Sequence, residues 1–357
     1  MSVTPRLLPL LAFLALTPAD AGSAEDPAAL IEHGHYQRAR AIVEPRAAAN
    51  PKDAEALWLL SQIRLAFGAE DNALKLAQQA VDLEPKNARY HEQLGDVYGQ
   101  MAGEAGAFKA LGLAKRFRKE TDIALGIDST LVEARRGLIE FYWRAPGIAG
   151  GSKDRARALI EELGAISVVE GALAQARLAL WEKDTTRAEA MIGKALKLDA
   201  RDYAVHVQAA QLHAARRQWS EVEREAEAAR ALEPDRAGSH ALLALAQAHR
   251  QHWVELDSTL ARAESSVPDN LAPCYQAARA LIEDGTELPR AERYLRKYLG
   301  RPPEGFAPTH AHAHWRLAQA LEQEGRRPDA VAELEAALRL KPNLDAAKKD
   351  LKRLKSG

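Results

Sequence analysis

The sequence has a single cysteine, Cys274, few aromatic residues and almost no net charge. One cysteine cannot form an internal disulfide, and its position far from the N-terminus excludes a lipid-modified cysteine there. Lys and Arg together number 49 and Asp and Glu 50, so no overall field attracts nucleic acid or an anionic membrane. We therefore expect no nucleic-acid partner.

Long apolar runs are also missing, with one short exception near the N-terminus. Residues 7–16 form an apolar run that follows Arg6 and precedes the small-residue pattern Ala19-Asp20-Ala21. Such a run is about half as long as a membrane-spanning helix, but it is typical of a cleaved secretory signal. We expect a signal peptide at residues 1–21, a periplasmic or secreted mature chain, and no membrane insertion after cleavage. An uncleaved anchor is the alternative.

Catalytic motifs are missing as well. The sequence has no His-Glu-x-x-His, no Gly-x-Ser-x-Gly and no paired-carboxylate constellation. Gly-Gly-Ser-Lys at residues 150–153 follows a predicted helix and has Ser before Lys, unlike the phosphate loop of nucleotide-hydrolysing enzymes. We expect no enzymatic activity and no cofactor.

Ala, Leu, Glu and Arg dominate the sequence instead, and these residues favour helix. Helix ends recur at a fixed spacing: Ala200, Pro234 and Pro268 are 34 residues apart, and an alanine precedes each of them by five residues. A period of 34 residues is that of a helix-turn-helix repeat, whose copies stack on one another because none can bury its apolar face alone.

The segment HEQLGDVYGQ carries Leu94, Gly95 and Tyr98 at the Leu-Gly-x-x-Tyr spacing of one such repeat. On these residues the chain resembles the tetratricopeptide repeat family, in an exported bacterial form. The resemblance implies an all-α, right-handed superhelical solenoid of about nine repeats over residues 22–343, irregular at 102–166, with a polar capping helix at 344–357. It also implies a concave face that binds a protein or peptide partner.

Two consecutive repeats depart from the period. Between Gly95 and the repeat-ending Ala124 lie ten more residues than the period allows, which predicts a second helix about three turns longer than its neighbours. This helix, at 105–126, is the most basic segment of the chain. A lengthened turn at 146–152 follows, with Ser152 placed to cap the next helix. Each segment is either structural or a contact surface for a ligand, and the sequence leaves both alternatives open.

The chain has eleven histidines, which raises the question of a metal site. His310 and His314 share one helical face and could hold a divalent metal if a third ligand came from elsewhere. However, His314 occupies the fourth repeat position, as do His91, His206 and His240, and the family places a packing side chain there. We expect structural histidines and no metal, and we keep metal or small-ligand binding as the alternative function.

The resemblance also indicates which side chains face the concave side. Arginines beside aromatic residues are what peptide grooves tend to use. Trp143 is the expected anchor, with Arg136 and Arg144 as hydrogen-bond donors. We therefore predict a non-catalytic scaffold of the cell envelope that binds a protein or peptide. The predicted partner-binding residues are Arg136, Glu140, Trp143, Arg144, Arg177, Trp181, Tyr275, Arg279 and Trp315.

Overall fold

The computed structural model describes residues 25–356, and within that range the chain is entirely helical, with no strand. The predicted signal peptide at residues 1–21 lies outside the described residues. No helix in the described part is both long and apolar enough to cross a bilayer. The elements are α1 (Pro27–His33), α2 (Tyr36–Ala49), α3 (Ala54–Ala66), α4 (Glu70–Leu83), α5 (Ala88–Glu104), α6 (Ala107–Ile127), α7 (Val132–Arg144), the 3-10 turn η1 (Gly147–Ala149), α8 (Lys153–Ile166), α9 (Val168–Trp181), α10 (Thr185–Leu198), α11 (Tyr203–Ala215), α12 (Trp219–Leu232), α13 (Ala237–His249), α14 (Trp253–Ser266), α15 (Ala272–Asp284), α16 (Leu288–Leu299), α17 (His310–Gln323), α18 (Arg327–Leu340) and α19 (Asp345–Ser356).

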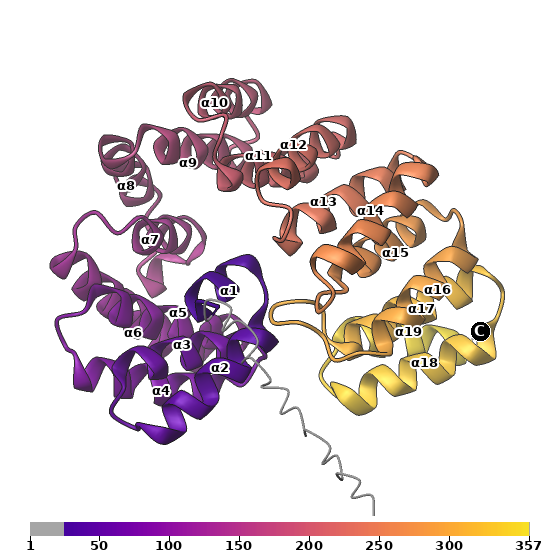
Figure 1. The fold of residues 1–357 in the computed structure, drawn as a ribbon, viewed down its shortest axis with the longest axis horizontal. Helices are drawn as coiled ribbons and strands as arrows, with labels where there is room; N and C mark the ends of the chain where they lie inside the picture. Colours follow the sequence, from indigo (N-terminus) through magenta and orange to yellow (C-terminus); the bar gives the residue numbers. More distant parts are fainter. Residues whose placement is uncertain (1–24, 357) are drawn as a thin grey trace, which may run out of the picture.

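Consecutive helices form antiparallel pairs that stack side by side, which confirms the predicted all-α solenoid (Figure 1). Small residues let the helices approach closely. A Cβ atom at Gly171 would lie 2.4 Å from the Cα atom of Gly164, so α9 and α8 could not pack as they do with larger residues there. In the second pair, the Ser61 hydroxyl of α3 donates to the Ala73 carbonyl of α4 at 2.9 Å.

Short polar side chains begin many of these helices. The Asp53 carboxylate accepts from the Ala56 amide at 3.0 Å, and the Asp202 carboxylate accepts from the Val205 amide at the same distance. Each satisfies one of the amides that a helix leaves unpaired at its start. The sequence periodicity and the caps therefore determine the same helix boundaries.

The third helix pair differs from the prediction for the basic segment. The ten additional residues do not lengthen only the second helix. Both helices take them up: α5 has 17 residues where α3 has 13, and α6 has 21 where α4 has 14. The predicted increase of about three turns in the second helix is therefore wrong, because the extension is shared across the pair. Helix α6 packs closely on α5 and makes few contacts with α7.

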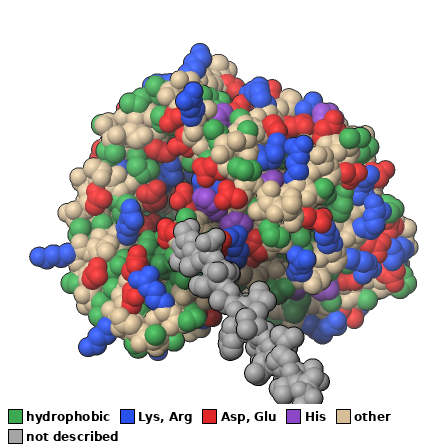
Figure 2. Space-filling model, in the orientation of Figure 1, with side chains coloured by type: hydrophobic (Ala, Val, Ile, Leu, Met, Phe, Trp, Pro, Cys, Tyr) green, Lys and Arg blue, Asp and Glu red, His purple; other side chains and the backbone are tan. Residues whose placement is uncertain are grey.

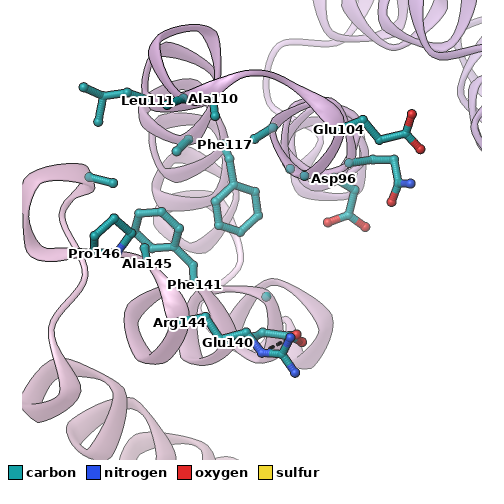
Figure 3. A pocket seen from close by; sticks show the side chains of 18 of the residues that line it. Asp96, Glu104, Ala110, Leu111, Phe117, Glu140, Phe141, Arg144, Ala145 and Pro146 are labelled. Carbon is teal, nitrogen blue, oxygen red and sulfur yellow. Dashed lines mark ion pairs between the residues drawn. The ribbon is translucent and has the colours of Figure 1, made fainter. Parts of the chain in front are cut away.

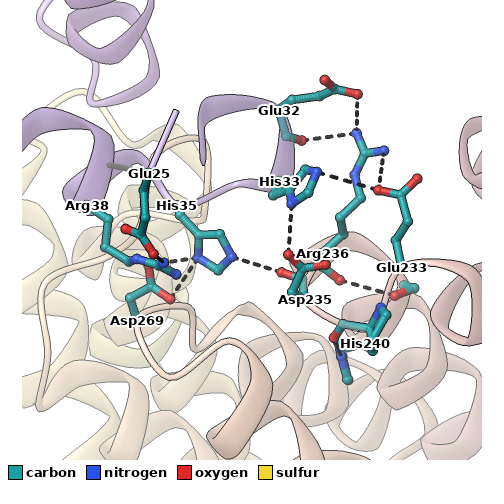
Figure 4. A network of polar contacts seen from close by, with 12 residues as sticks. Glu25, Glu32, His33, His35, Arg38, Glu233, Asp235, Arg236, His240 and Asp269 are labelled. Carbon is teal, nitrogen blue, oxygen red and sulfur yellow. Dashed lines mark hydrogen bonds and ion pairs between the residues drawn. The ribbon is translucent and has the colours of Figure 1, made fainter. Parts of the chain in front are cut away.

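The solenoid curves into a ring whose first helix pair meets loops 200 or more residues away in sequence (Figures 1 and 4). The His35 ring lies between two loops: its Nδ1 is 2.8 Å from a carboxylate oxygen of Asp269, and its Nε2 is 2.8 Å from the Asp235 carbonyl oxygen. Arg236 reaches back to the Glu32 carboxylate at 2.9 Å.

A third loop, between α16 and α17, completes the closure. The Gln37 amide donates to the Glu304 carboxylate at 2.6 Å, and Glu304 is 2% exposed. The Tyr36 ring packs edge-on against Phe306, with 5.8 Å between centroids. Gly305 has φ +49°, and a Cβ atom there would lie 2.2 Å from the Tyr36 ring, so only glycine fits this loop against α2.

Candidate partner-binding surface

The divergence of α6 from α7 opens a cavity of about 1150 Å³, which we call the wedge. Its lining is mostly apolar, and Phe117 of α6 and Phe141 of α7 extend into it with 5.5 Å between ring centroids (Figure 3). Phe306, on the closing loop from the far side of the ring, also lines it. The wedge is therefore lined by the two lengthened helices, by α7 with the turn after it, and by the closing loop.

Large apolar side chains at the wedge are exposed to an unusual degree. In the described residues, four large hydrophobic side chains are more than 60% exposed, and three of them line the wedge: Phe108 at 96%, Ile148 at 83% and Phe306 at 61%. Clusters of exposed apolar residues mark interaction sites more often than scattered ones do.

The lengthened turn at 146–152 is a compact structure that positions Ile148. The amides of residues 149–152 all donate to backbone carbonyls, including Ser152 to Tyr142 at 2.8 Å. A Cβ atom at Gly151 would lie 1.8 Å from the Ala145 carbonyl oxygen, so this close approach requires glycine. Because these amides already have partners, they are not a cradle for a phosphate. The Ser152 hydroxyl caps α8 by accepting from the Arg155 amide at 3.3 Å, as predicted.

Carboxylates are gathered at one side of the wedge. Asp96 and Glu104 lie on α5 and Glu140 lies on α7 (Figure 3). Burial raises the pKa of Glu92, and the adjacent charge of Asp96 raises it further, so that neutral Glu92 donates a hydrogen bond to Asp96. Glu140 pairs with Arg144 at 3.1 Å, whereas Asp96 and Glu104 have no ion-pair partner among the described residues. With the proton of the pair on Glu92, Asp96 and Glu104 are two carboxylates of the wedge without a paired cation among the described residues.

Most of the predicted concave residues on α7 and α9 meet around hollows next to the wedge. One hollow is lined by Arg136, Glu140, Arg177 and Trp181. A second hollow is lined by Glu140, Arg177 and Trp181 together with Arg144. The Arg136 guanidinium already donates to Glu170 at 2.9 Å. Arg177 is half-buried and makes no ion pair within the described residues.

Trp143 has a different environment from the one expected of an anchor. Its ring stacks on Trp181 with 5.3 Å between centroids and an interplanar angle of 14°. The Lys153 ammonium lies 4.9 Å and the Arg157 guanidinium 5.6 Å from the same ring. Trp143 is not among the residues that line the wedge or the two hollows. The ring is held by neighbouring side chains, and its role as an anchor stays a prediction.

The remaining predicted residues lie on α15 and α17, in another part of the ring. Tyr275 is 5% exposed and packs on Tyr298, which leaves little of its ring for a partner. The Trp315 indole donates to Asp350 of α19 at 2.8 Å, and the Arg279 guanidinium lies 3.6 Å from Glu283. The structure therefore does not bring these three residues together with those of α7 and α9.

The histidines at the fourth repeat position are structural, as predicted. In His91, His206 and His240, Nε2 lies within 3.1 Å of the backbone carbonyl oxygen six residues earlier, so each ring ties the start of a first helix to the preceding turn. His310 and His314 do not converge on a common point: His310 bonds to the Arg301 carbonyl and His314 to Glu333. The described residues contain no group of three or more potential metal ligands.

The sequence analysis missed the exposed apolar residues of the wedge. Ile148 stands between Gly147 and Ala149 in a lengthened turn, and Phe306 stands between Gly305 and Ala307 in another. A bulky apolar residue in a glycine-rich turn cannot be buried in the helix pairs, so the sequence could have indicated that these two side chains are exposed. The ring closure that makes Phe306 part of the wedge left no comparable signal in the sequence.

Comparisons with known proteins find repeat proteins. The family model for the tetratricopeptide repeat matches residues 29–88 and 275–345. Yeast Tom70 is 13% identical over 92% of this chain and 86% of its own, with a TM-score of 0.49. A thermophilic repeat protein of Thermus thermophilus is 22% identical over 52% and 94%, with a TM-score of 0.46. Pseudomonas aeruginosa PilF is 16% identical over 66% and 99%, with a TM-score of 0.41.

A search of curated proteins finds no match for this chain. The two segments that match the family model carry helix pairs of the same antiparallel form as those between them. Over these two segments the chain is similar to the tetratricopeptide repeat family, and the helix pairs between them have the same form.

Proposed function

We propose that this protein is a non-catalytic scaffold of the cell envelope that binds a partner polypeptide on the inner side of the ring, at α7 and α9. The observation that carries the proposal is Arg177, a half-buried guanidinium beside Trp181 that makes no ion pair among the described residues. An arginine next to an aromatic ring is a common energetic centre of protein interfaces, and it can donate two parallel hydrogen bonds to a carboxylate.

The mixed surface charge fits a polypeptide partner better than a polyanion. Figure 2 shows Lys and Arg side chains interspersed with Asp and Glu on one face of the ring. A nucleic-acid surface needs a positive stripe, and the formal net charge of this chain is −1. The scaffold therefore recognises its partner through a local site and not through a long-range field.

The cell-envelope location rests on the predicted signal peptide at residues 1–21. If this segment is cleaved, the mature protein begins at Gly22 or within a few residues of it. N-terminal sequencing of the protein purified from an envelope fraction measures this directly. An intact Met1 in that fraction would contradict export with cleavage.

The binding site is tested with Arg177→Glu, which replaces the donor by a repelling charge. A partner is first identified by cross-linking in envelope extract, and its affinity for each variant is then measured by calorimetric titration. Loss of an interface centre costs about 2 kcal/mol, which corresponds to roughly thirtyfold weaker binding.

Arg201→Glu is the matched control for this titration, because it makes the same charge change at an exposed turn between α10 and α11. It should leave the affinity unchanged. Equal affinity of the Arg177→Glu variant and the wild type would place the partner site elsewhere on the ring.

A further inference from the structure

The wedge lies between the two irregular repeats. At several other places in the solenoid the second helix of one pair packs extensively against the first helix of the next, as α4 does against α5 and α12 against α13. At the wedge, the first turns of α6 have no such cover, and the apolar residues that would meet it are left in contact with solvent. These uncovered residues include Phe108 and Leu111. They form an unpartnered apolar surface beside a preformed cavity.

The charged residues of the wedge determine which charge a bound ligand can carry. The only basic residue in the lining, Arg144, is paired with Glu140, whereas Asp96 and Glu104 face the cavity without a cation. An occupant that brought a phosphate or carboxylate would place like charges together at this side. An occupant with an ammonium or guanidinium group would instead supply the missing partner.

We propose that the wedge binds an apolar polypeptide segment of a partner protein that carries a lysine or arginine. The apolar side chains of the segment pack between Phe108, Ile148 and the Phe117–Phe141 pair. The basic side chain points to Asp96 and Glu104. This inference rests on the proposed function, because it also assumes a polypeptide partner. The residues that would contact the segment in the wedge differ from those around Arg177.

The size of the wedge supports a peptide over a small metabolite. Sites for drug-sized molecules hold about 300 to 1000 Å³, and the wedge holds about 1150 Å³. Its walls are two helices and a 3-10 turn whose amides are already satisfied, so the surface is preorganised. A preformed apolar surface keeps low the ordering cost of binding an extended or helical segment.

The test uses fluorescein-labelled synthetic peptides and fluorescence anisotropy with the purified full chain. The first peptide is a short run of Leu and Ala with one Lys, the second has Glu in place of Lys, and the third has Ser in place of each Leu. We expect the Lys peptide to bind at least tenfold more tightly than either of the others. The tighter binding reflects apolar burial and the pairing with Asp96 and Glu104.

The protein variants are chosen so that folding is not at stake. The double variant Phe108→Ser with Ile148→Ser should weaken binding of the Lys peptide at least tenfold, because both side chains are exposed and their loss disturbs no core. Val254→Ser is the matched control, since Val254 is 80% exposed on α14 and does not line the wedge. Circular dichroism melting curves of all variants should superimpose.

Asp96→Asn tests the charge. It should reduce the preference for Lys over Glu, while Arg201→Glu, at the exposed turn between α10 and α11, leaves the affinity for the Lys peptide unchanged. The titration of the partner against Arg177→Glu tests the proposed function, and the Lys peptide tests this site, so the two can fail separately.

Three results would overturn the inference. One is equal affinity of the wild type and the double variant for the Lys peptide. Another is equal affinity of the wild type for the Lys and Glu peptides. The third is binding to anionic phospholipid vesicles that the double variant loses, without binding of any peptide, which would make the wedge a lipid site.

Discussion

Replacing Glu304 by glutamine should make the closure of the ring less dependent on pH. Glu304 lies in the loop between α16 and α17 and accepts from the Gln37 amide of α2, while its other carboxylate oxygen has no hydrogen-bond partner among the described residues. Burial raises the pKa of Glu304 to about 7, and the nearby charge of Asp269 also raises it. The closed ring thus favours the neutral acid, which glutamine imitates.

The sign and size follow from proton linkage. Because the pKa of Glu304 is higher in the closed ring than in the opened one, this group stabilises closure fully below about pH 4.5. It loses that contribution as the pH rises through about 7. A shift of this size corresponds to about 3 kcal/mol. At pH 5 the variant and the wild type should be nearly equal, and at pH 8 the variant should be more stable by an amount approaching that figure.

Other groups in the closure act in known directions. Burial lowers the pKa of His35, but its hydrogen bond to Asp269 and the charge of that carboxylate outweigh burial and raise it overall. His35 therefore also loses its contribution as the pH rises through its raised pKa. For Asp235 and Asp269, burial raises the pKa, but the hydrogen bonds to His33 and His35 outweigh burial and lower the pKa of both carboxyls. These two carboxylates therefore stabilise closure at neutral pH and lose that contribution only as the pH falls. The difference between variant and wild type isolates Glu304.

The assay is hydrogen exchange of the α1 and α2 amides, which reports local opening of the first helix pair. The wild type should lose protection there between pH 5 and pH 8, after correction for intrinsic exchange, and the Glu304→Gln variant should lose less. Glu161→Gln, at an exposed position on α8, should behave as the wild type does. If Glu304→Gln retained the full pH dependence, the assignment of the neutral acid to this site would be refuted.

Three further substitutions test the repeat architecture and the predicted anchor. Gly325→Ala should cost about 1 kcal/mol, measured by denaturant unfolding, because φ is +77° there although a Cβ atom would meet nothing within 4 Å; an unchanged midpoint would show that this turn relaxes freely. Ala244→Trp should lower the melting temperature because Ala244 is fully buried in a helix contact, and an unaltered melting curve would argue against the assigned packing. Trp143→Ala should weaken partner binding roughly thirtyfold in calorimetric titration if Trp143 is an anchor; wild-type affinity with intact helix would leave it a purely structural residue.

The sequence predicted features that depend on contacts within one repeat or between neighbours. The 34-residue spacing of Ala200, Pro234 and Pro268 indicated the helix pairs, and the fourth-position histidines bond to a carbonyl only six residues earlier in the chain. Ser152 was identified as a cap because capping involves only the next three residues. Such contacts follow from local spacing.

Features that depend on the course of the whole solenoid could not be predicted in this way. The path of a superhelix is the sum of small rotations between repeats, and the sequence does not state their size. Contact of His35 with Asp269 is the result of that sum. The division of ten additional residues between α5 and α6, and the stacking of Trp143 on Trp181, likewise depend on how neighbouring pairs are tilted.

The closure by His35, Arg236 and Glu304 changes the mechanical character of the molecule. An open solenoid resembles a spring, since small adjustments at each interface add up to a large change in length and in the width of its groove. The contacts of α1 and α2 with the loops before α13, α15 and α17 join distant parts of the solenoid, so its curvature is fixed. A ligand therefore cannot widen the inner side of the ring by small changes at each interface. It must either fit the surface as it is, or the contacts of α1 and α2 with the distant loops must break first.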